Sequence, residues 1–144
     1  METQTRYTYQ QSVAKPLSLK PLTLWTGRVL SYLPALFLLV DAAMKLAKPT
    51  FVVEATLKIG FPESSILVMG ITLLVSTILY LIPRTAVLGA ILLTGNLGGA
   101  VATHVRDSAP LFNDLFPVMF GVALWGGLWL RDTRLRELIP LKSH

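Results

Sequence analysis

The chain has 144 residues, of which 53% are hydrophobic and 15% are charged, and its formal net charge is +5. Because a soluble domain carries about 25% charged residues, this composition indicates an integral membrane protein whose main partner is the lipid bilayer. The absence of cysteine excludes disulfides, thiolate metal sites and dithiol redox chemistry. No basic patch is interleaved with aromatic residues, so nucleic acid is excluded as a partner.

The N-terminal part of the chain predicts a polar tail followed by a membrane span. Residues 1–21 are polar and precede the first apolar run without a small-residue cleavage site, which predicts an uncleaved tail. The first span is expected at residues 22–44. Asp41 and Lys45 are spaced i,i+4 near its outer end, so they either pair with each other or belong to a site.

A short amphipathic helix is expected between the first and second spans. Apolar residues recur at helical spacing, and Glu54 and Lys58 form an i,i+4 pair in the favourable order. The segment is too short and too mixed to cross a bilayer, so we expect it to lie at the outer interface. There it serves either as an ordered connector or as a lid over a cavity between the helices.

Three further spans are predicted at residues 65–82, 84–104 and 113–130, since a helical span needs roughly 20 mainly apolar residues. The pair Gly95 and Gly99, together with the small residues Ala123 and Gly127, predicts close packing of the third and fourth spans. The expected fold is an all-α integral membrane four-helix bundle over residues 22–131. A short interfacial helix joins spans one and two, and residues 132–144 form a basic tail.

The basic residues predict the orientation of this bundle. With four spans both termini lie on one side, and that side holds most of the Lys and Arg residues: Arg6, Lys15, Lys20, Arg84, Arg131, Arg134, Arg136 and Lys142. The opposite side holds Lys45, Lys48, Lys58 and Arg106. Trp25, Tyr80 and Trp129 fall near the more basic side, where aromatic rings favour the interface. We therefore expect a bacterial inner membrane protein with both termini in the cytoplasm.

Polar residues gather toward the outer ends of the first and third spans. On a helical wheel Asn96 and Thr103 share one face of the third span, whereas His104 lies about 80° away. Asn96 is the deepest and must find a partner, either on another helix or in a ligand. A candidate small-molecule cavity near the outer face is therefore assigned six residues: Asp41, Lys45, Asn96, Thr103, His104 and Arg106. No metal-ligand pattern and no pair of nucleophile and base is present, so neither a metal site nor a catalytic residue is predicted.

Three stretches, in their order along the chain, carry a resemblance to a known family. They are MKL with the P-x-F-V segment and Gly60-Phe61-Pro62, then IPRTAVLGAILLTGNLGGAVATHVR over residues 82–106, then LWLRDTRLRELIP. In this order the sequence resembles the DoxX-like family over about residues 24–140. The resemblance implies a small four-helix membrane protein of a family named after a subunit of a thiosulfate:quinone oxidoreductase. Other members are associated with oxidative or quinone stress, and the resemblance implies no catalytic set.

These observations leave three functional hypotheses, and they leave open whether the chain is an enzyme. The first is a quinone- or redox-linked membrane subunit with a redox partner subunit, in which Asn96, His104 and Lys45 offer polar groups to a quinone. The second is a structural or assembly subunit of a membrane complex. The third is a small proton-coupled transporter built on Asp41, which is weaker because Asp41 lies near the end of its span.

Overall fold

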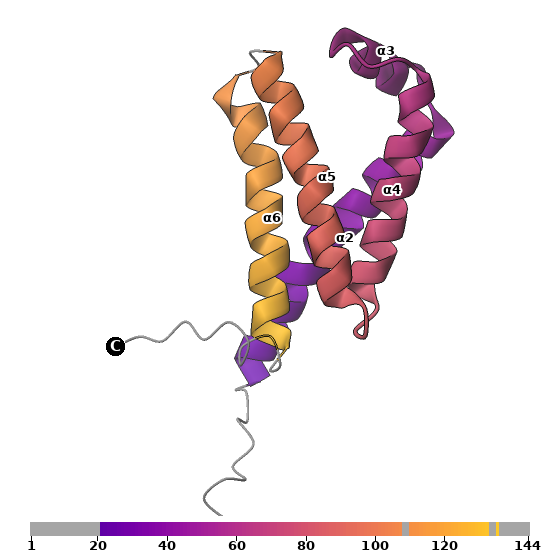
Figure 1. Cartoon of the computed structure of the whole chain (residues 1–144). Coiled ribbons are helices and arrows are strands. Elements are labelled where there is room, and N and C mark those ends of the chain that lie inside the picture. Colours follow the sequence, from indigo (N-terminus) through magenta and orange to yellow (C-terminus); the bar gives the residue numbers. More distant parts are fainter. Residues whose placement is uncertain (1–20, 108–109, 133–134, 136–144) are drawn as a thin grey trace, which may run out of the picture.

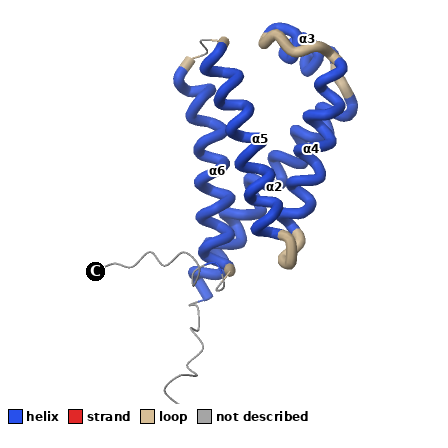
Figure 2. The backbone as a smooth tube through the Cα atoms, in the orientation of Figure 1, coloured by secondary structure: helices blue, strands red, loops and turns tan. Residues whose placement is uncertain are grey.

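The computed structural model describes residues 21–107, 110–132 and 135, and within these residues it contains helices and no strands (Figure 2). The helices are α2 (Pro21–Ala47), α3 (Thr50–Lys58), α4 (Ser64–Leu81), α5 (Ala86–Arg106) and α6 (Leu111–Arg131). The all-helical prediction is therefore confirmed. Apart from Pro21, Asp132 and Leu135, the two predicted tails lie outside the described residues.

The four long helices form a ring in which each packs on two neighbours. Both α2 and α5 pack on α4 and on α6, and the short α3 joins α2 to α4 at one end of the bundle (Figure 1). Three stretches are long and apolar enough to cross a membrane, namely Leu24–Ala47, Ser64–Leu81 and Ala86–Arg106. The apolar stretch of α6, Leu115–Arg131, is shorter. Among the described helices, three are thus long and apolar enough to span a membrane, whereas the sequence predicts four spans.

Large apolar side chains cover the outside of the bundle. Leu33 of α2 is 68% exposed, and Met119 and Val122 of α6 are 65% and 69% exposed. Exposing such side chains to water costs about 25 cal/mol for each Å² of apolar surface, and soluble monomers rarely carry large patches of them. A surface of this kind is suited to the hydrocarbon core of a bilayer.

One end of the bundle is tightly packed, and we call it the closed end; it contains the turn between α4 and α5. A Cβ added to Gly127 of α6 would lie 2.7 Å from the backbone nitrogen of Ser31 in α2. At Gly89 of α5, an added Cβ would overlap the backbone of α4 at Tyr80. The fully buried Tyr80 hydroxyl donates a hydrogen bond to the Leu124 carbonyl oxygen at 2.8 Å, which ties α4 to α6 across the bundle.

The opposite end, which carries α3, is open. Toward this end α4 and α5 diverge (Figure 1). Most residues of the buried core lie nearer the closed end, among them Tyr80, Ala86, Ala90, Leu93, Leu124 and Leu128. The ring of helices is therefore filled by side chains in one half and leaves space in the other.

The predicted packing of the third and fourth spans is confirmed, since α5 packs on α6, but the small residues expected to mediate it do not do so. A Cβ on Gly95 or Gly99 would meet no atom within 4 Å, so this pair does not bring two helices together. The close approach of α6 occurs at Gly127, and its neighbour there is α2 rather than the third span. Tyr80, expected at the membrane interface, is buried because its hydroxyl finds a carbonyl partner inside the bundle.

Candidate functional site

A cavity of about 860 Å³ occupies the open half of the bundle, with walls from all four long helices. Its volume lies within the range of about 300–1,000 Å³ found for small-molecule sites. The lining is mostly apolar, with a few polar side chains from α2, α4 and α5. This combination is typical of a site that holds an apolar molecule and fixes its orientation through a small number of polar contacts.

An aromatic cluster forms the wall between α2 and α6. The ring centroid of Phe37 lies 5.6 Å from that of Phe116 and 5.0 Å from that of Phe120, and the latter two are 4.7 Å apart. The rings meet at tilted or edge-on angles of 42° to 68°, the arrangement that aromatic quadrupoles favour. All three side chains line the cavity, so a flat ligand would find an aromatic surface there.

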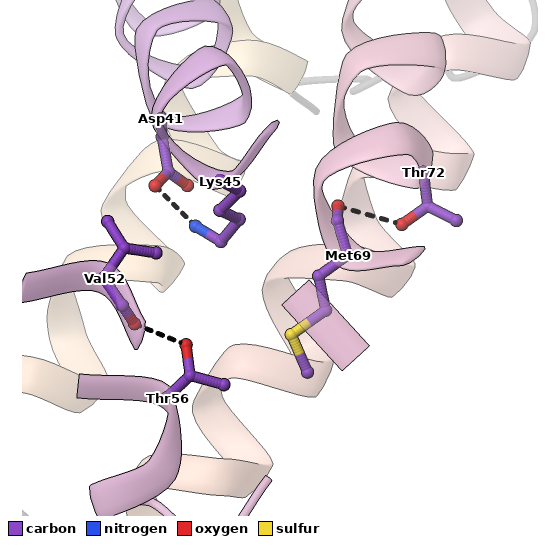
Figure 3. Close-up of polar contacts among 6 residues, drawn as sticks. All are labelled: Asp41, Lys45, Val52, Thr56, Met69 and Thr72. Atoms are coloured by element: carbon purple, nitrogen blue, oxygen red, sulfur yellow. Dashed lines mark hydrogen bonds and ion pairs between the residues drawn. The ribbon is translucent and has the colours of Figure 1, made fainter. Parts of the chain in front are cut away.

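An ion pair lines the cavity on α2. The Lys45 Nζ donates to Asp41 Oδ1 at 2.5 Å, and the two side chains are 26% and 31% exposed. Figure 3 shows the pair on one side of the view and Thr72 with Met69 of α4 on the other. The ammonium carries three protons and the pair uses one, so Lys45 retains donor capacity toward the cavity.

Asn96 of α5 joins the opposite wall to α4. Its Nδ2 donates to Ser76 Oγ at 3.2 Å and to the Leu92 carbonyl oxygen at 3.1 Å. The second contact fixes the orientation of the amide, because a carbonyl oxygen can only accept. Asn96 therefore makes the interhelical bond that was one of its two expected roles, and it also lines the cavity, which was the other.

The carbonyl oxygen of Asn96 keeps unused acceptor capacity. Thr72 Oγ1 lies 3.4 Å from Asn96 Oδ1, but it also donates to the Val68 carbonyl oxygen at the shorter distance of 2.9 Å. A hydroxyl has a single proton to donate, so its bond to Asn96 is at best shared and weak. Asn96 Oδ1 can accept a hydrogen bond from a ligand that carries an O–H or N–H group.

Other hydroxyls of the cavity wall donate their protons to their own helices. Ser76 Oγ donates to the Thr72 carbonyl oxygen at 2.6 Å, and Thr103 Oγ1 donates to the Gly99 carbonyl oxygen at 2.8 Å. What these groups offer to the cavity is acceptor lone pairs. These hydroxyls therefore offer acceptors on α4 and α5, whereas Lys45 supplies donors on the α2 side.

Arg106 lies outside the lining and instead ties α5 to the connection between α3 and α4. Its Nη2 donates to the Ile59 carbonyl oxygen at 2.8 Å, and its guanidinium lies 5.3 Å from the Phe61 ring centroid. α3 ends in a Schellman motif at Gly60, with the Phe61 nitrogen donating to the Thr56 carbonyl oxygen at 3.2 Å. This turn presents both partners of Arg106, and Ile59 and Phe61 themselves line the cavity.

Five of the six candidate residues thus line one cavity: Asp41, Lys45, Asn96, Thr103 and His104. The sequence analysis missed Thr72 and Ser76, and it missed the aromatic cluster of Phe37, Phe116 and Phe120. Thr72 with Ser76, and Phe116 with Phe120, are each spaced i,i+4, which places each pair on one helix face. That spacing is the signal in the sequence by which these residues could have been found.

A second, smaller hollow of about 360 Å³ lies between α5 and α6. Gly98 and Trp125 line it, and the Trp125 Nε1 donates to Thr94 Oγ1 at 2.9 Å across the two helices. Gly98 is thus separated from its neighbours Gly95 and Gly99, which line the main cavity. The described part of the chain contains no group of three His, Cys, Asp or Glu residues placed to hold a metal ion.

Comparisons with known proteins give one match. A search of curated proteins and a search of solved structures found nothing that matches the chain. The sequence model of the DoxX-like family matches residues 29–127, a stretch that contains every residue lining the main cavity. Because this match covers more than half of the chain, we conclude that the chain belongs to the DoxX-like family.

Proposed function

We propose that this chain is a membrane subunit that binds a quinone-class molecule in the main cavity and passes it to, or receives it from, a redox partner subunit. The observation that carries the proposal is the cavity of about 860 Å³, which combines an aromatic wall with polar groups on α2, α4 and α5. A quinone requires the same combination, because its ring is flat and apolar and its two oxygens lie on opposite sides.

The positions of the polar groups support this pose. Asp41 and Lys45 line the cavity on α2, and Asn96 lines it on α5. Polar groups on two different helices can each face a different oxygen of a quinone ring. In this pose the Lys45 ammonium, held beside Asp41, donates to one oxygen and Asn96 faces the other.

The hydrogen-bonding capacity of Asn96 favours the reduced form of the ligand. Both amide protons of Asn96 are engaged, so the group that remains for a ligand is the acceptor Oδ1. A quinol hydroxyl can donate to it, whereas a quinone carbonyl would face it with two acceptors and no proton. We therefore expect the site to hold the quinol more tightly than the quinone.

In this role the chain crosses the bilayer four times, with its closed end in the cytoplasm. The 21 residues of α6 extend about 30 Å at 1.5 Å per residue, which matches the thickness of the hydrocarbon core. The proposed orientation follows the excess of Lys and Arg at the closed end and in the two tails. α3 then lies at the outer interface of a bacterial inner membrane.

Ligand binding by the full-length protein in mild detergent tests the proposal. Mass spectrometry of co-purified lipids shows whether quinones are enriched, and titration with a benzoquinone and a naphthoquinone, each oxidised and reduced, gives the affinities. We expect Asn96→Leu to weaken quinol binding about 3- to 10-fold, the value of one hydrogen bond, and to affect the quinone less. Thr94→Val, on the same helix but outside the cavity, is the control and should change neither. Failure of the wild-type protein to bind any of these molecules would remove the proposed function.

A further inference from the structure

The main cavity reaches the outer surface of the bundle between α4 and α5. Its lining includes the interior residues Leu38 and Leu73, which are 4% and 6% exposed. The same lining includes Ile71 and Val75 of α4, which are 46% and 48% exposed. One continuous space therefore extends from the centre of the bundle to the surface that carries its apolar side chains.

Two polar contacts between α5 and the α3–α4 region frame this opening. Nearer the closed end, the Asn96 Nδ2 donates to Ser76 Oγ at 3.2 Å. At the open end, Arg106 donates to the Ile59 carbonyl oxygen and lies over the Phe61 ring. These contacts join α5 to α4 and to the α3–α4 connection at two heights, and the stretch of α5 between Asn96 and Arg106 borders a window in the side of the bundle.

The edge of the window on α5 is made of glycine. Gly95 directly precedes Asn96 at the lower corner of the window, and Gly99 follows one turn later, between the two contacts. Both line the cavity, and a Cβ on either would meet no atom within 4 Å. The absence of side chains here keeps the window open, whereas the opposite edge carries Ile71 and Val75.

We propose that the cavity is loaded from within the bilayer through this window between α4 and α5, and that its ligand is a lipid-dissolved molecule with a polar head and an alkyl chain. The head lies in the cavity, and the chain leaves through the window into the surrounding lipid. The apolar rim is compatible with acyl chains, whereas polar groups such as Asn96 and Lys45 lie behind it. The identity of the head rests on the proposed function, but the window does not.

The first test measures what reaches the window, without any ligand. The chain has no cysteine, so single spin labels can be placed at Gly99→Cys, at Gly98→Cys as the exposed control outside the main cavity and at Glu54→Cys as the control on α3. In lipid nanodiscs we expect the label at position 99 to collide with dissolved oxygen as the label at 98 does, and to be protected from a water-soluble nickel chelate. Nickel access at 99 equal to that at 54 would show an aqueous funnel and overturn the proposal.

The second test compares ligands with and without a chain. The probes are a reduced benzoquinone bearing a decyl chain and the same ring without the chain, titrated against Gly95→Phe and the matched control Gly98→Phe in nanodiscs. We expect Gly95→Phe to weaken binding of the decyl compound about tenfold and to leave the chainless compound unchanged, and Gly98→Phe to change neither. Equal losses for both probes in Gly95→Phe would show that the cavity was filled rather than the window blocked, and would count against the proposal.

The two tests separate failure of the window from failure of the quinone assignment. If the wild-type protein binds neither probe, the proposed function falls, and the spin-label result alone decides whether the window opens to lipid. If both probes bind but the label at 99 reports water, the quinone assignment stands and the lateral route is wrong.

Discussion

At the scale of single residues, some glycines of this molecule are tightly packed and others border open space. A Cβ on Gly127 would lie 2.7 Å from the backbone nitrogen of Ser31, whereas a Cβ on Gly98 would meet no atom within 4 Å. In the first case the missing side chain allows two helices to touch. In the second it leaves a hollow, and the helix bears the lower helical propensity of glycine without gaining a contact.

We therefore expect Gly127→Ala to destabilise the fold and Gly98→Ala to leave it unchanged or slightly more stable. Overpacking against backbone costs about 1–3 kcal/mol, because neither helix can yield without moving its neighbours. Alanine at position 98 fills open space and favours the helix by about 0.5–1 kcal/mol. Thermal unfolding in detergent, followed by circular dichroism, measures both changes. Equal midpoints for the two variants would contradict the packing described at the closed end.

At the scale of elements, the turn that ends α3 sets how α3 is held against α5 at the open end. Gly60 has a φ of +82°, a conformation that costs an L-residue about 1–2 kcal/mol. The Schellman bonds around it set the positions of the Ile59 carbonyl and the Phe61 ring, which Arg106 holds. A change of backbone at Gly60 should therefore be transmitted to α5 through a single arginine.

Gly60→Ala should loosen α3 from α5 while leaving the closed end intact. We expect faster amide hydrogen exchange over Thr50–Lys58 and an unchanged rate around Tyr80, because the strain is local to the turn. Arg106→Gln should give the same pattern, since it removes the bond to Ile59 and the contact with Phe61 without straining the turn. Lys58→Ala, at an exposed position of α3, is the control. Unchanged exchange in both test variants would mean that Arg106 does not hold α3.

Element positions could be predicted from the sequence, but the residues that join the elements could not. Each predicted segment corresponds to a helix whose ends differ by up to a few residues, such as 22–44 against Pro21–Ala47, because apolar length fixes where a helix can cross a bilayer. The Gly95 and Gly99 pair wrongly predicted a helix contact, because spacing shows which residues share a helix face but not what that face contacts. His104 and Asn96, about 80° apart on the wheel, both line the cavity because it borders a wide arc of α5.

At the scale of the whole molecule, packing and the candidate site are separated along the bundle axis. The closed end holds the closest glycine contacts, the Tyr80 hydroxyl bond and most of the buried core. The open half holds the cavity, where a Cβ at Gly95 or Gly99 meets no neighbour. Substitutions at these two glycines can therefore alter binding with little effect on stability, which makes them suitable probes of function.

The last prediction concerns which end of the bundle faces the cytoplasm and which faces outward. Because the chain has no cysteine, single cysteines can be labelled with a membrane-impermeant maleimide without background. We expect Glu54→Cys on α3 to be labelled in intact cells, and Arg84→Cys in the turn between α4 and α5 to be labelled only after lysis. Asp132→Cys, directly after α6, tests whether α6 crosses the bilayer, because α6 is not among the three stretches that are long and apolar enough to do so. Labelling at 132 only after lysis requires α6 to cross the bilayer and gives four spans, whereas labelling at 132 in intact cells would leave three spans and place the C-terminus outside.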